Sequence, residues 1–296
     1  MGGLSYTGEA EDGEVEDYYV QIVRSRSFSS VSGASCLTWS QPPTAVTSES
    51  SNVFHTGSVS SSLHLHEFAA DDWEPVENQP VTGIHWWGTF GGWTESHLPP
   101  DLPVAFHIGI WTDGTRDSDV FDHPGSLIWE TYSTNWVWAA SGNEESDSKS
   151  EPGETCFLFS QLLSQDQWFQ IDQARDGSGS TVYWLSIAAL YDSERDEPEH
   201  VWTWKLRATA SGAAGTSAQT ILPAANGLSW PPTLGAQWKT GREIYDSWFN
   251  PLDMAFQLTT YVPLELDARA SARADADAVG FGQLVTLAAE WLNTVR

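Results

Sequence analysis

Short runs of apolar or alternating residues, separated by stretches rich in Gly, Pro, Ser and acidic residues, recur through most of this 296-residue chain. Alternation with a period of two, and apolar runs of four to eight residues between turn signals, are typical of β-strands. We predict strands within residues 36–43, 63–68, 81–93, 104–111, 127–132, 135–138, 156–159, 168–171, 181–190, 201–206 and 254–262. About ten short strands at such spacing favour an all-β fold, an antiparallel β-sandwich of jelly-roll-like form.

Three of these runs carry more specific expectations. Residues 104–111 are apolar at both odd and even positions, which indicates a central strand buried on both faces. Residues 63–68 alternate strictly, which predicts a half-buried strand. Residues 201–206 also alternate, and the acidic turn before them predicts a hairpin with residues 181–190.

The N-terminal end predicts one additional strand over residues 14–23, which finish in β-branched residues. A lone strand cannot satisfy its own edges, so it must pair with a sheet, either its own or a neighbour's. Its candidate contact residues are Val15, Tyr18, Val20 and Ile22.

The C-terminal end predicts an amphipathic helix. Asp277 is a suitable N-cap, and Phe281, Leu284 and Trp291 recur after it at helical spacing, so this helix needs a surface to cover. The predicted organisation is an N-terminal strand segment 1–25, a linker 26–35, the sandwich 36–262, a linker 263–278 and a C-terminal helix 279–296.

Composition narrows the classes of partner. Lys and Arg number 13 against 40 Asp and Glu, which gives a formal net charge of −27. A surface of this sign repels phosphate backbones and anionic lipid, so binding to nucleic acid or to an anionic membrane is disfavoured. No run of 18 apolar residues offers a membrane span. Residues 1–5 carry no export signal, and we expect the chain to belong to a longer exported protein.

Tryptophan is unusually abundant, with 17 residues in the chain. On a strand, adjacent Trp86 and Trp87 must point to opposite faces, so one can anchor the core while the other meets solvent, a second sheet or a ligand. Trp93 follows two Gly residues and precedes a polar run, and it is the residue we most expect to be exposed. Two interpretations stay open for these three: a platform for sugar rings, or filling of the core.

Acidic and histidine residues offer the remaining candidate chemistry. Asp113, Asp117, Asp119 and Asp122 crowd one loop, where oxygen ligands suit Ca²⁺, although their spacing is not that of an EF-hand. A solvated acidic turn is the alternative. His residues at positions 64, 66, 85 and 107 read more simply as half-buried imidazoles than as metal ligands.

Neither a nucleophile elbow, a zincin motif, a P-loop nor a dinucleotide fingerprint occurs in the sequence. Cys36 and Cys156 lie far apart, which excludes a cysteine-built metal site and leaves a single disulfide open.

Residues 13–18, with the sequence Gly-Glu-Val-Glu-Asp-Tyr, resemble the closing strand of the GEVED domain, a β-sandwich module of secreted bacterial proteins. This resemblance covers about residues 8–23. It implies that the chain begins where such a domain would end.

A second resemblance spans about residues 37–260. Its motifs are Ala-Asp-Asp-Trp at 70–73, Ile-His-Trp-Trp-Gly at 84–88, Ile-Gly-Ile-Trp at 108–111 and His-Pro-Gly at 123–125. They are similar to an uncharacterised domain of secreted planctomycete-type bacterial proteins, which implies a secreted β-sandwich. The tail 279–292 resembles the last helix of degenerate dockerin-like tails, with Ala at most calcium-ligand positions.

These observations lead us to expect a non-enzymatic, extracellular or cell-surface structural or interaction protein, such as a self-assembling filament or surface-layer subunit. Its expected partners are further copies of itself or other surface proteins, and its expected cofactors are none apart from Ca²⁺ at the acidic loop. The alternative is a carbohydrate-binding module that holds polysaccharide on exposed Trp. A secreted glycoside hydrolase, which needs two carboxylates about 5–10 Å apart, is the less favoured third possibility.

Overall fold

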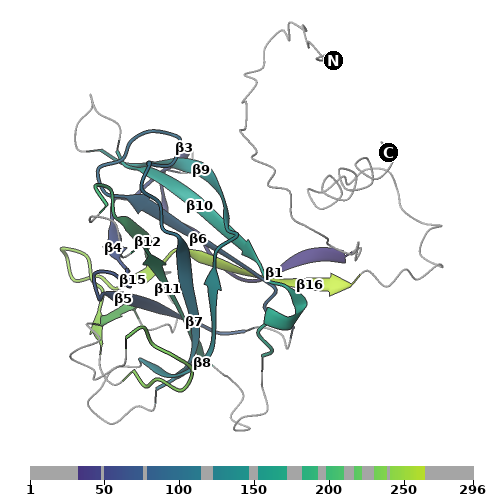
Figure 1. Ribbon diagram of the computed structural model, residues 1–296. Helices are drawn as coiled ribbons and strands as arrows, with labels where there is room; N and C mark the ends of the chain where they lie inside the picture. Colours follow the sequence, from purple (N-terminus) through teal and green to yellow (C-terminus); the bar gives the residue numbers. More distant parts are fainter. Residues whose placement is uncertain are drawn as a thin grey trace, which may run out of the picture.

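Two β-sheets face each other (Figure 1). Aromatic side chains fill much of the core between them. This arrangement is seen in a computed structural model, which describes residues 33–47, 50–75, 79–114, 123–146, 153–171, 182–192, 198–209, 217–221, 230–238 and 241–263. The predicted all-β sandwich is confirmed. The predicted strand 14–23 and the predicted helix 279–296 both lie outside the described residues.

The larger sheet has ten strands. Seven of them follow the order β1 (Gly33–Gln41), β16 (Phe256–Pro263), β6 (Gly83–Phe90), β10 (Thr155–Leu162), β9 (Val137–Glu144), β3 (Ser50–Phe54) and β2 (Ala45–Thr47). The other three are β12 (Trp202–Ala208), which pairs with β6, and β4 (Ser58–Ser60) and β15 (Leu252–Met254), which both pair with β12. Its pairs are antiparallel except for β3 with β9, which is parallel.

The smaller sheet has six antiparallel strands. Their order is β14 (Arg242–Glu243), β13 (Gln219–Ile221), β5 (Phe68–Trp73), β11 (Tyr183–Leu190), β7 (Ala105–Asp113) and β8 (Pro124–Ser133). A 3₁₀ turn, η1 (Gln165–Gln167), lies between β10 and β11 in the chain.

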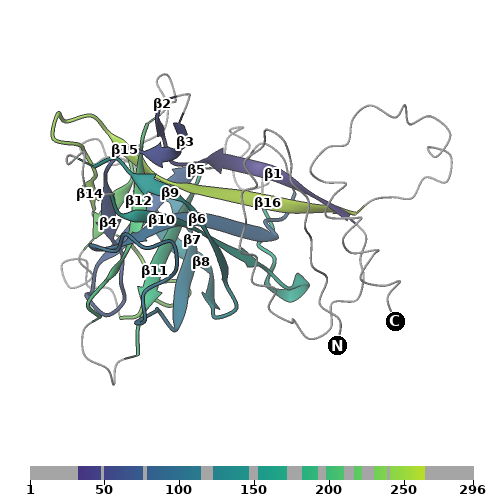
Figure 2. The ribbon, with the colours of Figure 1, turned by 90° about the horizontal axis from the view of Figure 1, so that it is seen from above.

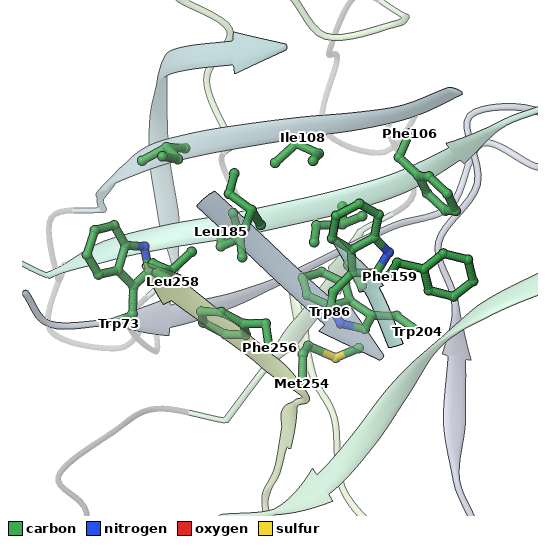
Figure 3. Close-up of a cluster of buried hydrophobic side chains, with 14 of the residues drawn as sticks. Trp73, Trp86, Phe106, Ile108, Phe159, Leu185, Trp204, Met254, Phe256 and Leu258 are labelled. Atoms are coloured by element: carbon green, nitrogen blue, oxygen red, sulfur yellow. The ribbon is translucent and has the colours of Figure 1, made fainter. Parts of the chain in front are cut away.

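The core between the sheets follows from strand alternation. On β6, Ile84 and Trp86 point inward, and they meet Phe106 and Ile108 of β7 in the opposite sheet. Trp86 is completely buried and packs edge-on against the ring of Phe106 at a centroid distance of 5.2 Å (Figure 3). Trp73 enters the same layer from β5. Bulky rings from both sheets therefore fill the gap that Leu and Met fill in other sandwiches.

A second apolar cluster covers the outer face of the six-stranded sheet. Phe68, Trp111 and Trp184 point away from the first core and pack with Trp238, which belongs to the segment 230–238 that runs over this face. Seven Trp side chains are almost completely buried across the two clusters: Trp73, Trp86, Trp111, Trp184, Trp202, Trp204 and Trp238. Central strand β7 is buried on both faces from Ala105 to Trp111, as its apolar pattern predicts.

Two strand predictions are wrong. Residues 63–66 form a turn, closed by a pair of hydrogen bonds between the backbones of Ser62 and Glu67, and the strand begins only at Phe68. Leu63 is buried in the outer cluster from this turn, so an alternating sequence finds its apolar contacts without a strand. At 168–171, Phe169 contributes an isolated bridge to Val81 in place of a strand.

The predicted hairpin between residues 181–190 and 201–206 is also wrong. Strand β11 uses both of its edges within the six-stranded sheet, one for β5 and one for β7. With neither edge open, β12 crosses to the other sheet and pairs with β6. The partner of β12 thus depends on both edges of β11 being paired already, and the local alternation of residues does not reveal this.

Replacement of Trp86 tests the aromatic core. We expect Trp86→Ala to lower the free energy of unfolding by about 3–5 kcal/mol, because it removes a fully buried ring and leaves a cavity. Trp248→Ala, at a position that is 83% exposed, should stay within about 0.5 kcal/mol of the wild type. Chemical denaturation measures both, and equal losses in the two variants would contradict the packing described.

Candidate functional site

The sequence-predicted ligand residues Trp86 and Trp87 are covered by protein. Trp86 lies in the core between the sheets, and Trp87 points to the other face of β6, where it packs with Phe54, Cys156 and Ala255. Trp87 is 7% exposed. A sugar cannot stack on either ring, so the expected ligand-binding role of these two residues is corrected.

Trp93 is partly exposed, just beyond the end of β6. Its indole N–H donates to the carbonyl of His97 at 2.6 Å, and the imidazole rings of His97 and His200 pack edge-on against it, with centroids 5.3 and 4.9 Å away. Glu154 accepts a hydrogen bond from the nearby Gly92 N–H. The ring is held on several sides by its own neighbours, which fits an anchor of the β6 end better than an open platform.

The acidic loop is seen only at its first residue. The Asp113 carboxylate accepts a hydrogen bond from the indole N–H of Trp184 at 2.8 Å, which ties the end of β7 to β11. Asp117, Asp119 and Asp122 lie outside the described residues. Within the ranges described, no group of three or more His, Cys, Asp or Glu side chains is arranged to hold a metal ion.

A buried carboxylate joins the two sheets at the end of β15. Asp71 of β5 accepts hydrogen bonds from the Gln41 side chain at 2.6 Å and from the Met254 N–H at 2.8 Å. Burial raises the pKa of Asp71 well above its usual range, and the carboxylates of Asp253 and Asp72 raise it further. At 1% exposure Asp71 is closed to any substrate, so its chemistry is structural.

A buried ion pair secures the turn between β3 and β4. The Lys205 ammonium lies 2.5 Å from the Glu144 carboxylate, and it also donates to the carbonyls of His55 and Gly57. All three of its donors are therefore satisfied, which is the condition under which a buried charge is tolerated. The pair ties β12 to β9 and to the turn at residues 55–57.

Two histidines lie in polar settings, His107 buried and His85 partly buried. His107 lies 2.9 Å from the Glu130 carboxylate beneath the outer cluster, and His85 lies 2.8 Å from the Ser160 hydroxyl on the outer face of the ten-stranded sheet. Burial lowers the pKa of both imidazoles. His85 and Ser160 resemble a nucleophile and its base, but the ring's second nitrogen faces only the Thr259 hydroxyl, at 3.5 Å, and not a carboxylate that would orient it.

The two cysteines are free thiols. Cys36 is exposed on β1, whereas Cys156 is buried on β10. Burial raises the pKa of Cys156 to about 12, so it stays protonated and unreactive. Cys36 is accordingly the accessible thiol of the described residues.

Strand β1 forms an outer edge of the ten-stranded sheet. It pairs with β16 along its whole length, from Gly33 opposite Pro263 to Gln41 opposite Phe256, and the two strands extend together past the rest of the sandwich (Figure 2). In the described part of the chain no strand pairs with the other side of β1. Its nine residues include no charge, and Leu37 is 60% exposed.

A second exposed feature is the turn between β14 and β15. Trp248 and Phe249 are 83% and 85% exposed, the highest values among the large apolar residues described. The Asp246 carboxylate accepts hydrogen bonds from the backbone N–H groups of Trp248 and Asn250, both at 2.8 Å, and from the Asn250 side chain. These bonds hold the turn in one shape with its two rings outward.

The sequence contains residues typical of a turn at this position. Asp246 and the Asn250-Pro251 pair are strong turn residues, and they bracket two adjacent aromatics. A strand would have to bury at least one of the two rings, whereas a turn can expose both.

Comparison of the sequence with known proteins adds one finding. Residues 37–259 match the family described as "Domain of unknown function (DUF7901)". The chain belongs to this family. Comparison with curated proteins and with solved structures gives no match.

The DUF7901 match has nearly the same bounds as the resemblance at residues 37–260, and it covers both β1 from Leu37 and the turn between β14 and β15. It does not extend to residues 13–18 or to the tail, so the GEVED-like and dockerin-like resemblances stay predictions. No helix in the described part of this DUF7901 chain has the length and apolar character needed to cross a lipid bilayer.

His85 and His107 predict that the free energy of unfolding depends on pH. Because the pKa values of His85 and His107 are lower in the folded chain than the ordinary value of 6.5, the unfolded chain binds more protons below that pH. Their contribution to stability is present above pH 6.5 and is lost as the pH falls toward the folded-state values. We expect the free energy of unfolding, measured in urea from pH 7.5 to 5, to decline less steeply in His85→Gln and His107→Gln than in the wild type.

His64→Gln, at an exposed position, is the matched control for these variants and should leave the slope unchanged. If the free energy of unfolding falls with pH as steeply in both test variants as in the wild type, the lowered pKa values of His85 and His107 are contradicted.

Proposed function

We propose that this chain is a non-enzymatic structural and interaction module of the bacterial exterior, which assembles by adding a strand from a neighbouring copy to the free edge of β1. The observation that carries the proposal is that edge: nine residues, unpaired within the described ranges, uncharged and partly apolar. Exterior location rests on the acidic composition and on the resemblance to secreted domains.

Free edges are normally protected in proteins that stay monomeric. Lys residues, prolines or inward-pointing charges interrupt them, because unpaired N–H and C=O groups recruit other strands. Strand β1 carries none of these residues. A β-bulge can also protect an edge, and β1 has a single register shift, between Leu37 and Trp39. Backbone hydrogen bonds would supply the affinity of an added strand, and side chains beside Leu37 would supply the selectivity.

The strand that we assign to this edge is the segment 14–23. Its ten residues match the nine of β1 in length, and its Val15, Val20 and Ile22 suit a strand that pairs in a sheet. Residues 24–32 connect the two segments, which permits the strand to join β1 of its own chain or of another. The self-assembly proposal commits to the second arrangement.

The buried ionisable groups support a non-catalytic role. Asp71, Lys205 and Glu144 are each buried and engaged by structural partners. They stabilise the sandwich and tie its strands together.

A charge placed on the β1 edge tests the assembly. We expect the 296-residue chain to form species of two or more times 32.6 kDa in light scattering at about 100 µM, and Leu37→Lys to shift it to the monomer, because an edge lysine opposes strand addition. Leu162→Lys is the matched control, since Leu162 is 61% exposed but lies on the interior strand β10.

Disulfide trapping at Cys36 identifies the incoming strand. Tyr18→Cys, Val20→Cys and Ile22→Cys, tested one at a time under mild oxidation, should form a bond to Cys36 of another chain, detected between two differently tagged copies. A wild type that is monomeric, or bonds to Cys36 within one chain only, would reject self-assembly. Val104→Cys, at another exposed position, controls for random collision.

A further inference from the structure

We propose that the turn 245–251, named here the aromatic turn, is a binding site for a neutral polysaccharide, with Trp248 and Phe249 contacting the sugar rings. This inference rests on observations separate from the β1 edge and does not depend on assembly there. It moves the carbohydrate-binding role from Trp86, Trp87 and Trp93 to residues that the sequence patterns did not single out.

Exposing two aromatic rings to water forgoes the free energy that their burial would supply. Burying an aromatic side chain is worth about 1.5–3 kcal/mol, and this sandwich buries seven Trp almost completely. Trp248 and Phe249 nevertheless stand in water side by side. Phe249 has a φ of 62°, a left-handed conformation that is unfavourable for a bulky residue, so the turn accepts strain to hold this shape.

Hydrogen bonds within the turn hold it in one conformation. In addition to the three hydrogen bonds that the Asp246 carboxylate accepts, its backbone N–H donates to the Asn250 carbonyl at 2.9 Å, and the Phe249 N–H donates to the Asp246 carbonyl at 3.1 Å. Hydrogen bonds from Asn250 hold the pKa of Asp246 below its usual range, so the carboxylate stays ionised. A preorganised site loses little conformational entropy when a ligand binds.

Polar groups that can bind sugar hydroxyls lie next to the two rings. Flat aromatic faces contact the apolar faces of sugar rings, and neighbouring amide, hydroxyl and carboxylate groups bond their hydroxyls. Ser247 and Asn250 flank the two aromatics directly, and an amide retains donor and acceptor capacity after one bond. At the base of the turn, the Tyr245 hydroxyl donates to Glu243 at 2.7 Å.

Charge selects a neutral ligand over the other candidates. The chain carries a net charge of −27, and residues 243–253 contain Glu243, Asp246 and Asp253. Arg242 precedes this segment and Arg207 lies opposite Asp253, so acidic residues outnumber basic ones there. Uronic-acid or sulfated polymers would be repelled. A lipid surface is disfavoured too, because loops that bind membranes pair their aromatics with basic residues, and an ionised Asp246 would have to follow the rings toward the lipid.

Position gives the turn access to a large polymer. The chain enters the sandwich at Gly33 and leaves it at Pro263, and these residues lie opposite each other at one end of the β1–β16 ladder. The aromatic turn precedes β15, beyond the other end of β16, whose eight residues span about 25 Å. Figure 2 shows β14 and β15 at the end of the molecule away from the projecting tips of β1 and β16.

Binding assays on the full chain test this site. Cellohexaose, chitohexaose and mannohexaose serve as neutral probes, oligoalginate as the acidic probe, and phosphatidylcholine vesicles as the lipid probe. We expect at least one neutral probe to bind and to protect Trp248 from iodide quenching. Trp248→Ala and Phe249→Ala should each weaken that binding by about tenfold or more, as truncation of a central contact residue does.

Leu234→Ala is the matched control, since Leu234 is 61% exposed and lies outside the aromatic turn. It should bind the neutral probe as the wild type does, and oligoalginate should not bind. The proposal is overturned if no neutral probe binds, if both aromatic variants bind like the wild type, or if oligoalginate binds as tightly. Trp248-dependent binding to vesicles without binding to sugars would assign the turn to lipid instead. None of these outcomes alters the expected mass of the wild type, so self-assembly is judged separately.

Discussion

Close packing of aromatic rings between two sheets is the constraint on which the rest of this structure depends. Trp86 and Phe90 of β6 meet Phe106 of β7 and Phe159 of β10 in one contiguous layer. Interiors tolerate neither voids nor overlap, so the positions of these rings fix the spacing of the sheets. At Gly88, a Cβ would lie 2.2 Å from the Trp202 indole nitrogen, and only a residue without a side chain lets β12 sit beside β6.

Polar groups then fix how the sheets meet at their rims. Asp71 binds Gln41 from β1 and Met254 from β15, so one carboxylate connects the six-stranded sheet to two strands of the other. Such a group adds directional bonds where apolar packing alone allows sliding. Lys205 acts within the ten-stranded sheet, where it joins β12 to β9 and fastens the turn at residues 55–57.

The sequence was sufficient for the elements whose apolar pattern and tertiary role agree. The buried run at 104–111 became a strand covered on both faces, and the Trp-rich run at 81–93 contains β6 at the centre of the larger sheet. The sequence was insufficient where a segment distant in the chain determines the local structure or the strand pairing. The hairpin expected at 201–206 failed because β11 was already paired on both sides, and the alternation at 63–66 was satisfied by a turn.

The same limit applied to function. Adjacent Trp86 and Trp87 both found protein to pack on, because this sandwich has an apolar cluster on each face of β6. Which aromatics remain outside depends on how much surface the surrounding strands supply, and that quantity is a property of the whole fold. Trp248 and Phe249 lie in the turn between β14 and β15, and both stay exposed.

The antiparallel pairing of β1 with β16 also decides how the domain responds to tension. Force that enters at Gly33 and leaves at Pro263 acts on two strands that meet at the same end of their ladder. Hydrogen bonds in such a ladder run perpendicular to the strands, so the load falls on one pair at a time and opens it like a zipper. A domain pulled in this way yields at low force and lengthens gradually. Opening starts at the projecting ends of β1 and β16, whereas Phe256 and Leu258 of β16 are held in the aromatic core.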